Sequence, residues 1–347
     1  MKYLFFLFAV LSGHHVLHAQ RVFFKSNQTF TEKTLETFYS SIALQGNLLL
    51  FNANDYELYA YNKNTGTLQW QQRLNWKSDV APFFAQGYVW ANGNNEVLQL
   101  DTATGKVKKA TVIARMDTQP TIIDGVLYST GIYDAGCLFA YDLKHDSMLW
   151  SRFIAHGIAQ TPFYLPNKII TNAEGNHWIE VGYKGNLLDT LCEKEEVGYP
   201  SELSCAKSFL LRTHDGKEIT GKLATKLDEN DNGLEQVFYT PEKTFVINDD
   251  KLFVIGNKGK LQLEKSLDAL ADGLETVYND EVKILKGDKQ TIWLHLGNHI
   301  LHYNFAKKKA LRSINLESWA PHQVLLDDSK IWLISSNDGL LYGLNMD

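Results

Sequence analysis

The sequence predicts an all-β fold, an eight-bladed β-propeller whose blades are four-stranded antiparallel sheets. Three observations predict it. An apolar segment recurs about every 40 residues, prolines recur at a similar interval, and clusters of turn-forming residues separate short runs of strand-forming residues. Repeats of about 40 to 50 residues are typical of propellers, because each blade is a single four-stranded unit.

The recurring segment is a short apolar and aromatic run that ends on a polar or small residue, first seen as Leu58–Asn62. Seven further copies follow, and their last residues fall at 62, 101, 142, 182, 222, 264, 304 and 345 when the first copy is included. Neighbouring copies are therefore 39 to 42 residues apart. Because eight copies fill the chain beyond its first residues, the sequence predicts eight blades.

Prolines follow the same rhythm. Proline has no backbone N–H to donate, so within a sheet it is favoured at the first residue of a strand. Six of the seven prolines lie just before an apolar run, and each is expected to mark the start of a blade: Pro82, Pro120, Pro162, Pro200, Pro241 and Pro321.

Between the apolar runs lie clusters of Gly, Asn and Asp, such as Asn92–Asn95 and Asn337–Gly339. These residues supply the positive φ angles of tight hairpin turns. The runs between them, such as Tyr88–Trp90 and Leu252–Ile255, are short and rich in aromatic or β-branched residues, which favours strands over helices. Each repeat is thus predicted to be a meander of four strands, A to D from the centre outward, with Leu252–Ile255 in a second strand.

The last repeat ends at Asp347, directly after its third strand, whereas the apolar segment Arg21–Lys25 precedes the first repeat. We expect this N-terminal segment to supply the fourth strand of the last blade. Such an arrangement closes the ring and removes the exposed edges that an open sheet would present.

Residues 1–19 have the features of a secretory signal peptide: Lys2, the short apolar run Tyr3–Leu11, and a small residue, Ala19, at the expected cleavage site. Residues 20–347 are then expected to form one propeller domain. The mature protein is expected in the periplasm or as a secreted protein. No cysteine lies near the cleavage site, which argues against a lipid anchor. No later apolar run is long enough to span a membrane.

The formal net charge of −6 argues against nucleic acid as a partner. Three cysteines are present, Cys137, Cys192 and Cys205. The repeat places the last two on an outer and an inner strand, too far apart for a disulfide, so free buried thiols are expected.

Two segments carry a family resemblance. Glu57–Trp70 and Cys137–Trp150 resemble the L-Y-A-L-D-x-x-T-G-x-x-x-W repeat of pyrroloquinoline-quinone-like propellers. The resemblance implies that Trp70 and Trp150 pack between blades. Repeat two has Lys109 near the Trp position, and the motif weakens in the later repeats.

Propellers with this repeat include quinone-dependent dehydrogenases and cofactor-free scaffolds such as the propeller lipoprotein of the outer-membrane assembly machinery. The chain has no adjacent cysteine pair and no recognisable Glu, Asn and Asp set for the calcium beside a quinone. The resemblance therefore implies a non-enzymatic, monomeric interaction scaffold without a cofactor, binding a protein or cell-envelope ligand on one face. The alternatives are a quinone-dependent oxidoreductase and a propeller enzyme acting on polysaccharide.

The loops that join one blade to the next emerge on one face around the central opening, where propellers commonly bind partners. Aromatic and arginine residues on such loops are typical anchors of an interface. The alternative is that they are scattered surface residues. The candidate set is Trp76, Arg115, Asp117, His156, Tyr199, Trp319 and His322.

One segment partly matches a calcium-binding loop, with Asp228, Asn230 and Asn232 as the oxygen ligands. Gln236 and Tyr239 stand where further ligands are required, so a solvated loop between blades is the alternative. No motif for a nucleophile or a phosphate-binding loop is present in the sequence.

Overall fold

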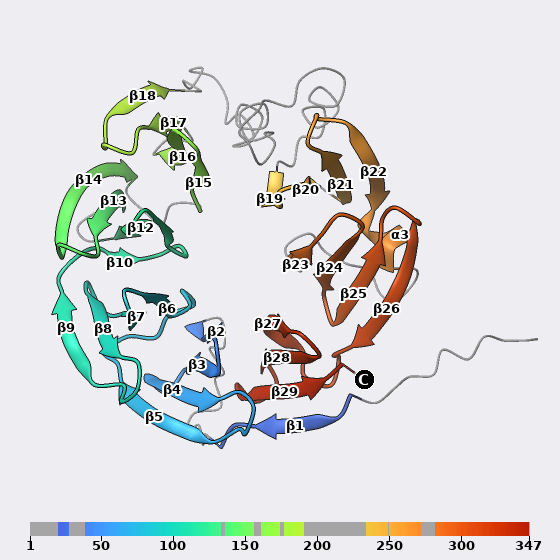
Figure 1. Ribbon diagram of the computed structural model, residues 1–347, viewed down its shortest axis with the longest axis horizontal. Coiled ribbons are helices and arrows are strands. Elements are labelled where there is room, and N and C mark those ends of the chain that lie inside the picture. Colours follow the sequence, from blue (N-terminus) through green and yellow to red (C-terminus); the bar gives the residue numbers. More distant parts are fainter. Residues whose placement is uncertain are drawn as a thin grey trace, which may run out of the picture.

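The strand-forming runs pair into antiparallel sheets that stand side by side in a ring (Figure 1). The computed structural model describes residues 20–27, 39–132, 136–155, 161–173, 177–190, 234–248, 250–271 and 282–346. Within these residues the strands form seven sheets, which we number blades 1 to 7 in chain order. The chain is therefore an all-β propeller with antiparallel blades.

Blades 1 to 3 use the strands from β2 to β14. Blade 1 contains β2 (Ser41–Gln45), β3 (Leu48–Asn52), β4 (Glu57–Asn62) and β5 (Leu68–Arg73). Blade 2 contains β6 (Phe83–Ala85), β7 (Tyr88–Asn92), β8 (Val97–Asp101) and β9 (Val107–Thr111). Blade 3 has a divided inner strand and contains β10 (Arg115–Met116), β11 (Thr121–Ile123), β12 (Val126–Ile132), β13 (Gly136–Asp142) and β14 (Ser147–Ala155).

Blades 4 to 6 follow the same plan. Blade 4 contains β15 (Phe163–Leu165), β16 (Lys168–Ala173), β17 (His177–Val181) and β18 (Leu187–Thr190). Blade 5 contains β19 (Leu234–Tyr239), β20 (Lys243–Asn248), β21 (Lys251–Gly256) and β22 (Leu261–Ser266), followed by the helix α3 (Leu267–Ala271). Blade 6 contains β23 (Val282–Gly287), β24 (Thr291–Leu296), β25 (His299–Asn304) and β26 (Lys309–Asn315).

Blade 7 combines the two ends of the chain. It contains β27 (Pro321–Asp327), β28 (Lys330–Ser335), β29 (Leu341–Asn345) and β1 (Val22–Lys25), which pairs with β29. The register of β1 places Phe24 opposite Gly343 and Lys25 opposite Tyr342. The predicted N-terminal closing strand is therefore confirmed.

The expected number of blades is wrong: the residues that the structure describes form a propeller of seven blades, not eight. The fifth of the eight predicted copies, which ends at residue 222, lies outside the described residues, as does Pro200. Spacing counts intervals of about 40 residues, whereas a blade requires strands that pair with one another.

The predicted strand order is also wrong in blade 5. Its innermost strand is β19, which contacts β23 of blade 6, just as the inner strands β23 and β27, and β27 and β2, contact each other. Pro241 consequently lies in the turn between the first two strands, and Leu252–Ile255 lies in the third strand rather than the second. In contrast, Pro82, Pro120, Pro162 and Pro321 lie at the start of strands on the inner side of their blades.

Where a recurring segment ends on Asn or Asp, that side chain can shape the turn that follows, as at Asn62 and Asp101. Asn62 Oδ1 accepts hydrogen bonds from the backbone N–H groups of Asn64 and Thr65. Asp101 Oδ1 accepts the same pair of bonds from Ala103 and Thr104. A side chain that binds the backbone two and three residues ahead stabilises a tight turn, which explains why Asn or Asp recurs here.

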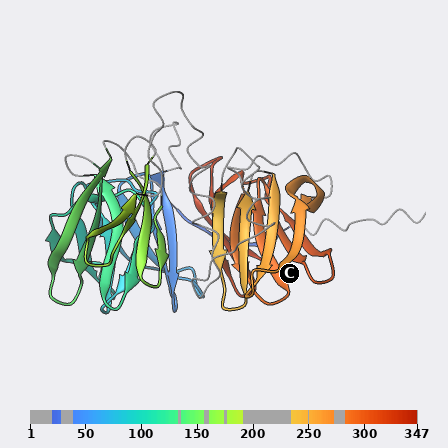
Figure 2. The ribbon, with the colours of Figure 1, turned by 90° about the horizontal axis from the view of Figure 1, so that it is seen from above.

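Seen edge-on, the strands run across the thickness of the ring (Figure 2). Turns therefore emerge on two faces. The turn face carries the turns between the first and second and between the third and fourth strands of each blade. The crossing face carries the turns between second and third strands and the linkers from one blade to the next.

Aromatic side chains on outer strands dock onto the next blade, as the repeat predicts. Trp70 in blade 1 is buried against Gly105 in blade 2, and its Nε1–H donates to Thr102 O at 2.9 Å. Trp150 in blade 3 packs on Gly185 in blade 4 in the same way, and its Nε1–H donates to Tyr183 O at 2.9 Å.

Where the repeat lacks the Trp, other side chains make the connection. Phe24 in blade 7 lies over Gly66 in blade 1. Lys109 in blade 2 forms an ion pair with Asp146 in blade 3. Each of these contacts again joins an outer strand to the turn face of the following blade.

Near the centre, glutamine side chains join the inner strands of neighbouring blades, or the residues just before those strands. Gln323 Oε1 accepts the backbone N–H of Ile42 at 2.8 Å, across the junction of blades 7 and 1. Gln236 Oε1 accepts the backbone N–H of Ile284 at 2.7 Å, between blades 5 and 6. Gln119 accepts from the backbone N–H of Ala81 at 2.9 Å, between blades 3 and 2.

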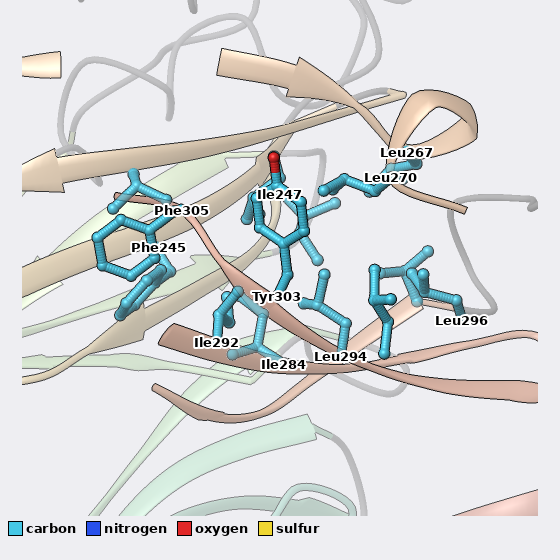
Figure 3. Close-up of a cluster of buried hydrophobic side chains, with 14 of the residues drawn as sticks. Phe245, Ile247, Leu267, Leu270, Ile284, Ile292, Leu294, Leu296, Tyr303 and Phe305 are labelled. Carbon is cyan, nitrogen blue, oxygen red and sulfur yellow. The ribbon is translucent and has the colours of Figure 1, made fainter. Parts of the chain in front are cut away.

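The core lies between the blades rather than in one central mass. Between blades 5 and 6, buried side chains from both sheets interdigitate, among them Phe245, Leu294 and Tyr303 (Figure 3). Leu267 and Leu270 from α3 cover this cluster and are almost completely buried. Within the described residues, no helix is sufficiently long and apolar to span a membrane.

Candidate functional site

Two of the candidate residues from the sequence meet on the crossing face. Trp76 lies in the linker between β5 and β6, and Arg115 begins β10 in blade 3. The guanidinium carbon of Arg115 lies 4.7 Å from the centroid of the Trp76 ring, and both residues are partly exposed. This is a cation–π contact between residues that are far apart in the sequence.

Asp117 lies nearby in the chain, but it holds blade 3 together. Its Oδ1 accepts a hydrogen bond from Thr130 Oγ1 at 2.5 Å, and its backbone N–H donates to Thr130 O at 3.2 Å. Thr118 and Ser129 extend this buried network. The carboxylate therefore stabilises the segment that separates β10 from β11.

Trp319 and His322 lie in and beside the linker that enters blade 7. The Trp319 ring packs edge-on against Tyr342, with a centroid distance of 6.1 Å, and it is partly buried against the core of blade 7. Burial lowers the pKa of His322, Lys283 lowers it further, and Asp79 raises it. Trp319 thus packs within blade 7, whereas His322 lies near the charged groups of Lys283 and Asp79.

The remaining candidates, His156 and Tyr199, lie outside the described residues, as do Asp228, Asn230 and Asn232 of the predicted calcium loop. They stay predictions, as does the signal peptide at residues 1–19. In the part of the chain that the structure describes, no three His, Cys, Asp or Glu side chains gather in a way that could hold a metal ion.

The structure adds residues that sequence reasoning missed. The Tyr56 ring contacts two cations: the Arg73 guanidinium carbon lies 5.2 Å and the Lys77 Nζ 5.3 Å from its centroid. Lys77 Nζ is also 5.8 Å from the centroid of Tyr39. We call the combined set the aromatic–basic patch; it consists of Tyr39, Tyr56, Arg73, Trp76, Lys77 and Arg115.

Tyr56 has a strained backbone, with φ of 67°. A bulky residue in this left-handed region is an outlier, and such strain persists only where the surroundings hold it. Two hydrogen bonds do so: Leu74 N–H donates to Tyr56 O at 2.7 Å, and Arg73 Nη1 donates to the carbonyl of Asp55 at 2.7 Å. The tyrosine side chain nevertheless remains 37% exposed.

A signal for Tyr56 was present in the repeat. The equivalent positions in blades 2 and 7 are Asn95 and Gly339, which also have positive φ angles, of 55° and 69°. Asn and Gly are the residues that tolerate this conformation. A tyrosine at the same turn position is therefore unexpected on structural grounds alone.

Comparison with known proteins supports the repeat. Residues 25–163 match the family model described as outer membrane protein assembly factor BamB. This segment is thus similar to PQQ-like propeller repeats. The resemblance expected from Glu57–Trp70 and Cys137–Trp150 is confirmed, because both lie within the match. No curated protein matches the chain.

Two solved structures are similar to these PQQ-like blades and their neighbours. The crystal structure of BamB from Moraxella catarrhalis is 12% identical, with 88% of this chain and 81% of that chain covered and a TM-score of 0.47. The computationally designed Ika8 protein is 13% identical, with 90% of this chain and 98% of that chain covered and a TM-score of 0.61. The second likeness shows a shared fold.

Proposed function

We propose that this protein is a non-enzymatic binding module of the cell envelope that recognises a protein partner through the aromatic–basic patch on its crossing face. The observation that carries the proposal is Tyr56, which stays exposed in contact with both Arg73 and Lys77 while its backbone is strained. The match to the BamB family model supports an assembly or scaffold role in the envelope.

The composition of the patch suits protein recognition. Trp, Tyr and Arg are the residues most enriched among the anchors that carry binding energy in interfaces. Here each cation already rests against an aromatic ring, so less side-chain freedom is lost when a partner docks. Arg115 on Trp76 and Lys77 between Tyr39 and Tyr56 are the clearest examples.

The proposal includes export by the signal peptide at residues 1–19 and action as a monomer in the periplasm or secreted space. The partner would be a protein or another envelope component that presents acidic and apolar groups to the patch. No cofactor is needed for this role.

The sharpest test replaces Tyr56 with asparagine, the residue that blade 2 has at the same position. The change relieves the strain, so the melting temperature should fall by no more than about 3 °C, while the anchor for the partner is lost. Crosslinking and mass spectrometry on envelope fractions should recover the wild-type partner at least about tenfold less well with Tyr56→Asn, equivalent to about 1.4 kcal/mol.

The triple variant Tyr56→Asn, Trp76→Ala, Arg115→Ala should abolish recovery. The matched control is Lys265→Ala, which removes a cation of blade 5, away from the patch, that lies 4.9 Å from the centroid of the Tyr303 ring of blade 6. Equal recovery by the triple variant and the control would reject the site.

A further inference from the structure

We infer that the turn face carries a second, separate binding site, a tyrosine-lined pocket that takes an organic cation such as an alkylammonium or guanidinium group. The pocket has a volume of about 580 Å³, within the range of small-molecule sites. Its described lining comes from blades 3, 4 and 5 and consists of Ile123, Asp124, Val126, Tyr128, Tyr164, Leu165, Pro166, Tyr183 and Tyr239.

Three of the tyrosine rings form a continuous wall. The Tyr128 and Tyr183 rings pack edge to face with centroids 5.1 Å apart, and Tyr164 lies 6.4 Å from Tyr128. Tyr239, at the end of β19, adds a fourth ring from blade 5. A site with several aromatic faces is the arrangement by which proteins recognise ammonium groups, because each ring face is electronegative.

Hydrogen bonds to the backbone orient two of these rings. Tyr164 OH donates to Tyr128 O at 3.2 Å, and Tyr183 OH donates to Leu165 O at 2.6 Å. These two hydroxyl protons are directed into the protein. The two phenol oxygens can therefore only accept hydrogen bonds from a ligand, which suits a cation better than an anion or a sugar that needs donors.

The charge of the pocket points the same way. Among the described lining residues, Asp124 is the one that is charged at neutral pH. Burial raises the pKa of Tyr128, and the nearby Asp124 carboxylate raises it further; burial likewise raises the pKa of Tyr183 to about 12. These phenols stay neutral, so the lining combines one carboxylate with uncharged aromatic walls.

The inference does not depend on the proposed function, because the aromatic–basic patch lies on the opposite face. The cation could be a free small molecule or a lysine or arginine side chain of a partner. Both sources share the chemistry that the pocket recognises, and separate ligands distinguish them.

The test compares choline with 3,3-dimethyl-1-butanol, which has the same shape without the charge, by calorimetric titration of the mature protein. We expect saturable choline binding at least about tenfold tighter than binding of the alcohol. N-acetylargininamide and N-acetyllysinamide form the second arm. Tighter binding of either amide than of choline assigns the site to a partner side chain, whereas tighter binding of choline assigns it to a free cation.

The variant Asp124→Asn keeps the shape and removes the charge. Asp124 has φ of 51°, which Asn tolerates, so the fold should be unaffected. Choline affinity should fall about fivefold or more, because the cation loses its carboxylate. The matched control is Asp328→Asn, at the equivalent turn of blade 7 with φ of 48°, which should bind like the wild type.

Three outcomes would overturn the inference: no saturable binding of any cation, equal affinity for choline and the alcohol, or equal affinities of Asp124→Asn and Asp328→Asn. None of them bears on partner recovery through the aromatic–basic patch. Failure of one site is thereby distinguished from failure of the other.

Discussion

At the scale of single residues, the blades are joined by aromatic side chains that need a neighbour without a side chain. Trp70 lies so close to Gly105 that a Cβ on this glycine would clash with the indole ring. Gly105 also has φ of +69°, a conformation that other residues rarely adopt. The Thr-Gly pair of the repeat is thus needed for contact with the Trp of the preceding blade.

We predict that Gly105→Ala destabilises the protein by about 2 to 4 kcal/mol, because it adds overpacking to backbone strain. The control is Gly46→Ala, which has φ of +57° but no atom within 4 Å of the added Cβ. Gly46→Ala should lower the free energy of unfolding by about 1 to 2 kcal/mol, because it adds backbone strain without overpacking. Urea unfolding measures both, and equal losses would show that the Trp70 contact does not matter.

At the scale of elements, the N-terminal strand β1 closes the ring through one side chain above all. Phe24 is 8% exposed and packs edge-on against Tyr61 of blade 1 and Trp332 of blade 7, with centroid distances of 5.1 and 5.5 Å. It therefore belongs to the interface of the first and last blades at once. Val22 on the same strand is 42% exposed.

We predict that Phe24→Ala lowers the free energy of unfolding by about 3 to 5 kcal/mol, the usual cost of removing a buried phenylalanine. Val22→Ala should change it by less than about 0.5 kcal/mol, because the side chain is exposed. Thermal unfolding followed by circular dichroism tests the pair. A similar melting temperature for both variants would contradict a closing role for β1.

At the scale of the whole molecule, the ring is held at its centre as well as at its rim. Gln323 binds the backbone of Ile42 across the same junction that Phe24 closes further out. If closure is cooperative, weakening one contact should reduce the contribution of the other.

We predict that Gln323→Met costs about 1 to 3 kcal/mol, since the partly buried Ile42 N–H loses its acceptor. Combined with Phe24→Ala, the loss should be smaller than the sum of the single losses. The double-mutant cycle is measured by urea unfolding. Strict additivity would mean that the centre and the rim close independently.

The candidate site was only partly predictable. Trp76 and Arg115 were found because aromatic and basic residues in blade linkers are typical anchors. Their contact depends on how blades 1 to 3 pack, and the approach of Arg73 and Lys77 to Tyr56 depends on how blade 1 folds with the linker that follows it. Trp319 looked equivalent in the sequence but packs against Tyr342.

The sequence by itself determined the repeat, the antiparallel strands and the closing N-terminal strand, because turn residues and strand propensity act locally and recur in each copy. Only the tertiary structure decided the number of blades and the strand order of blade 5, because these depend on which strands pair. The tyrosine pocket was likewise beyond the sequence, since its walls come from three blades and are joined only when the ring forms.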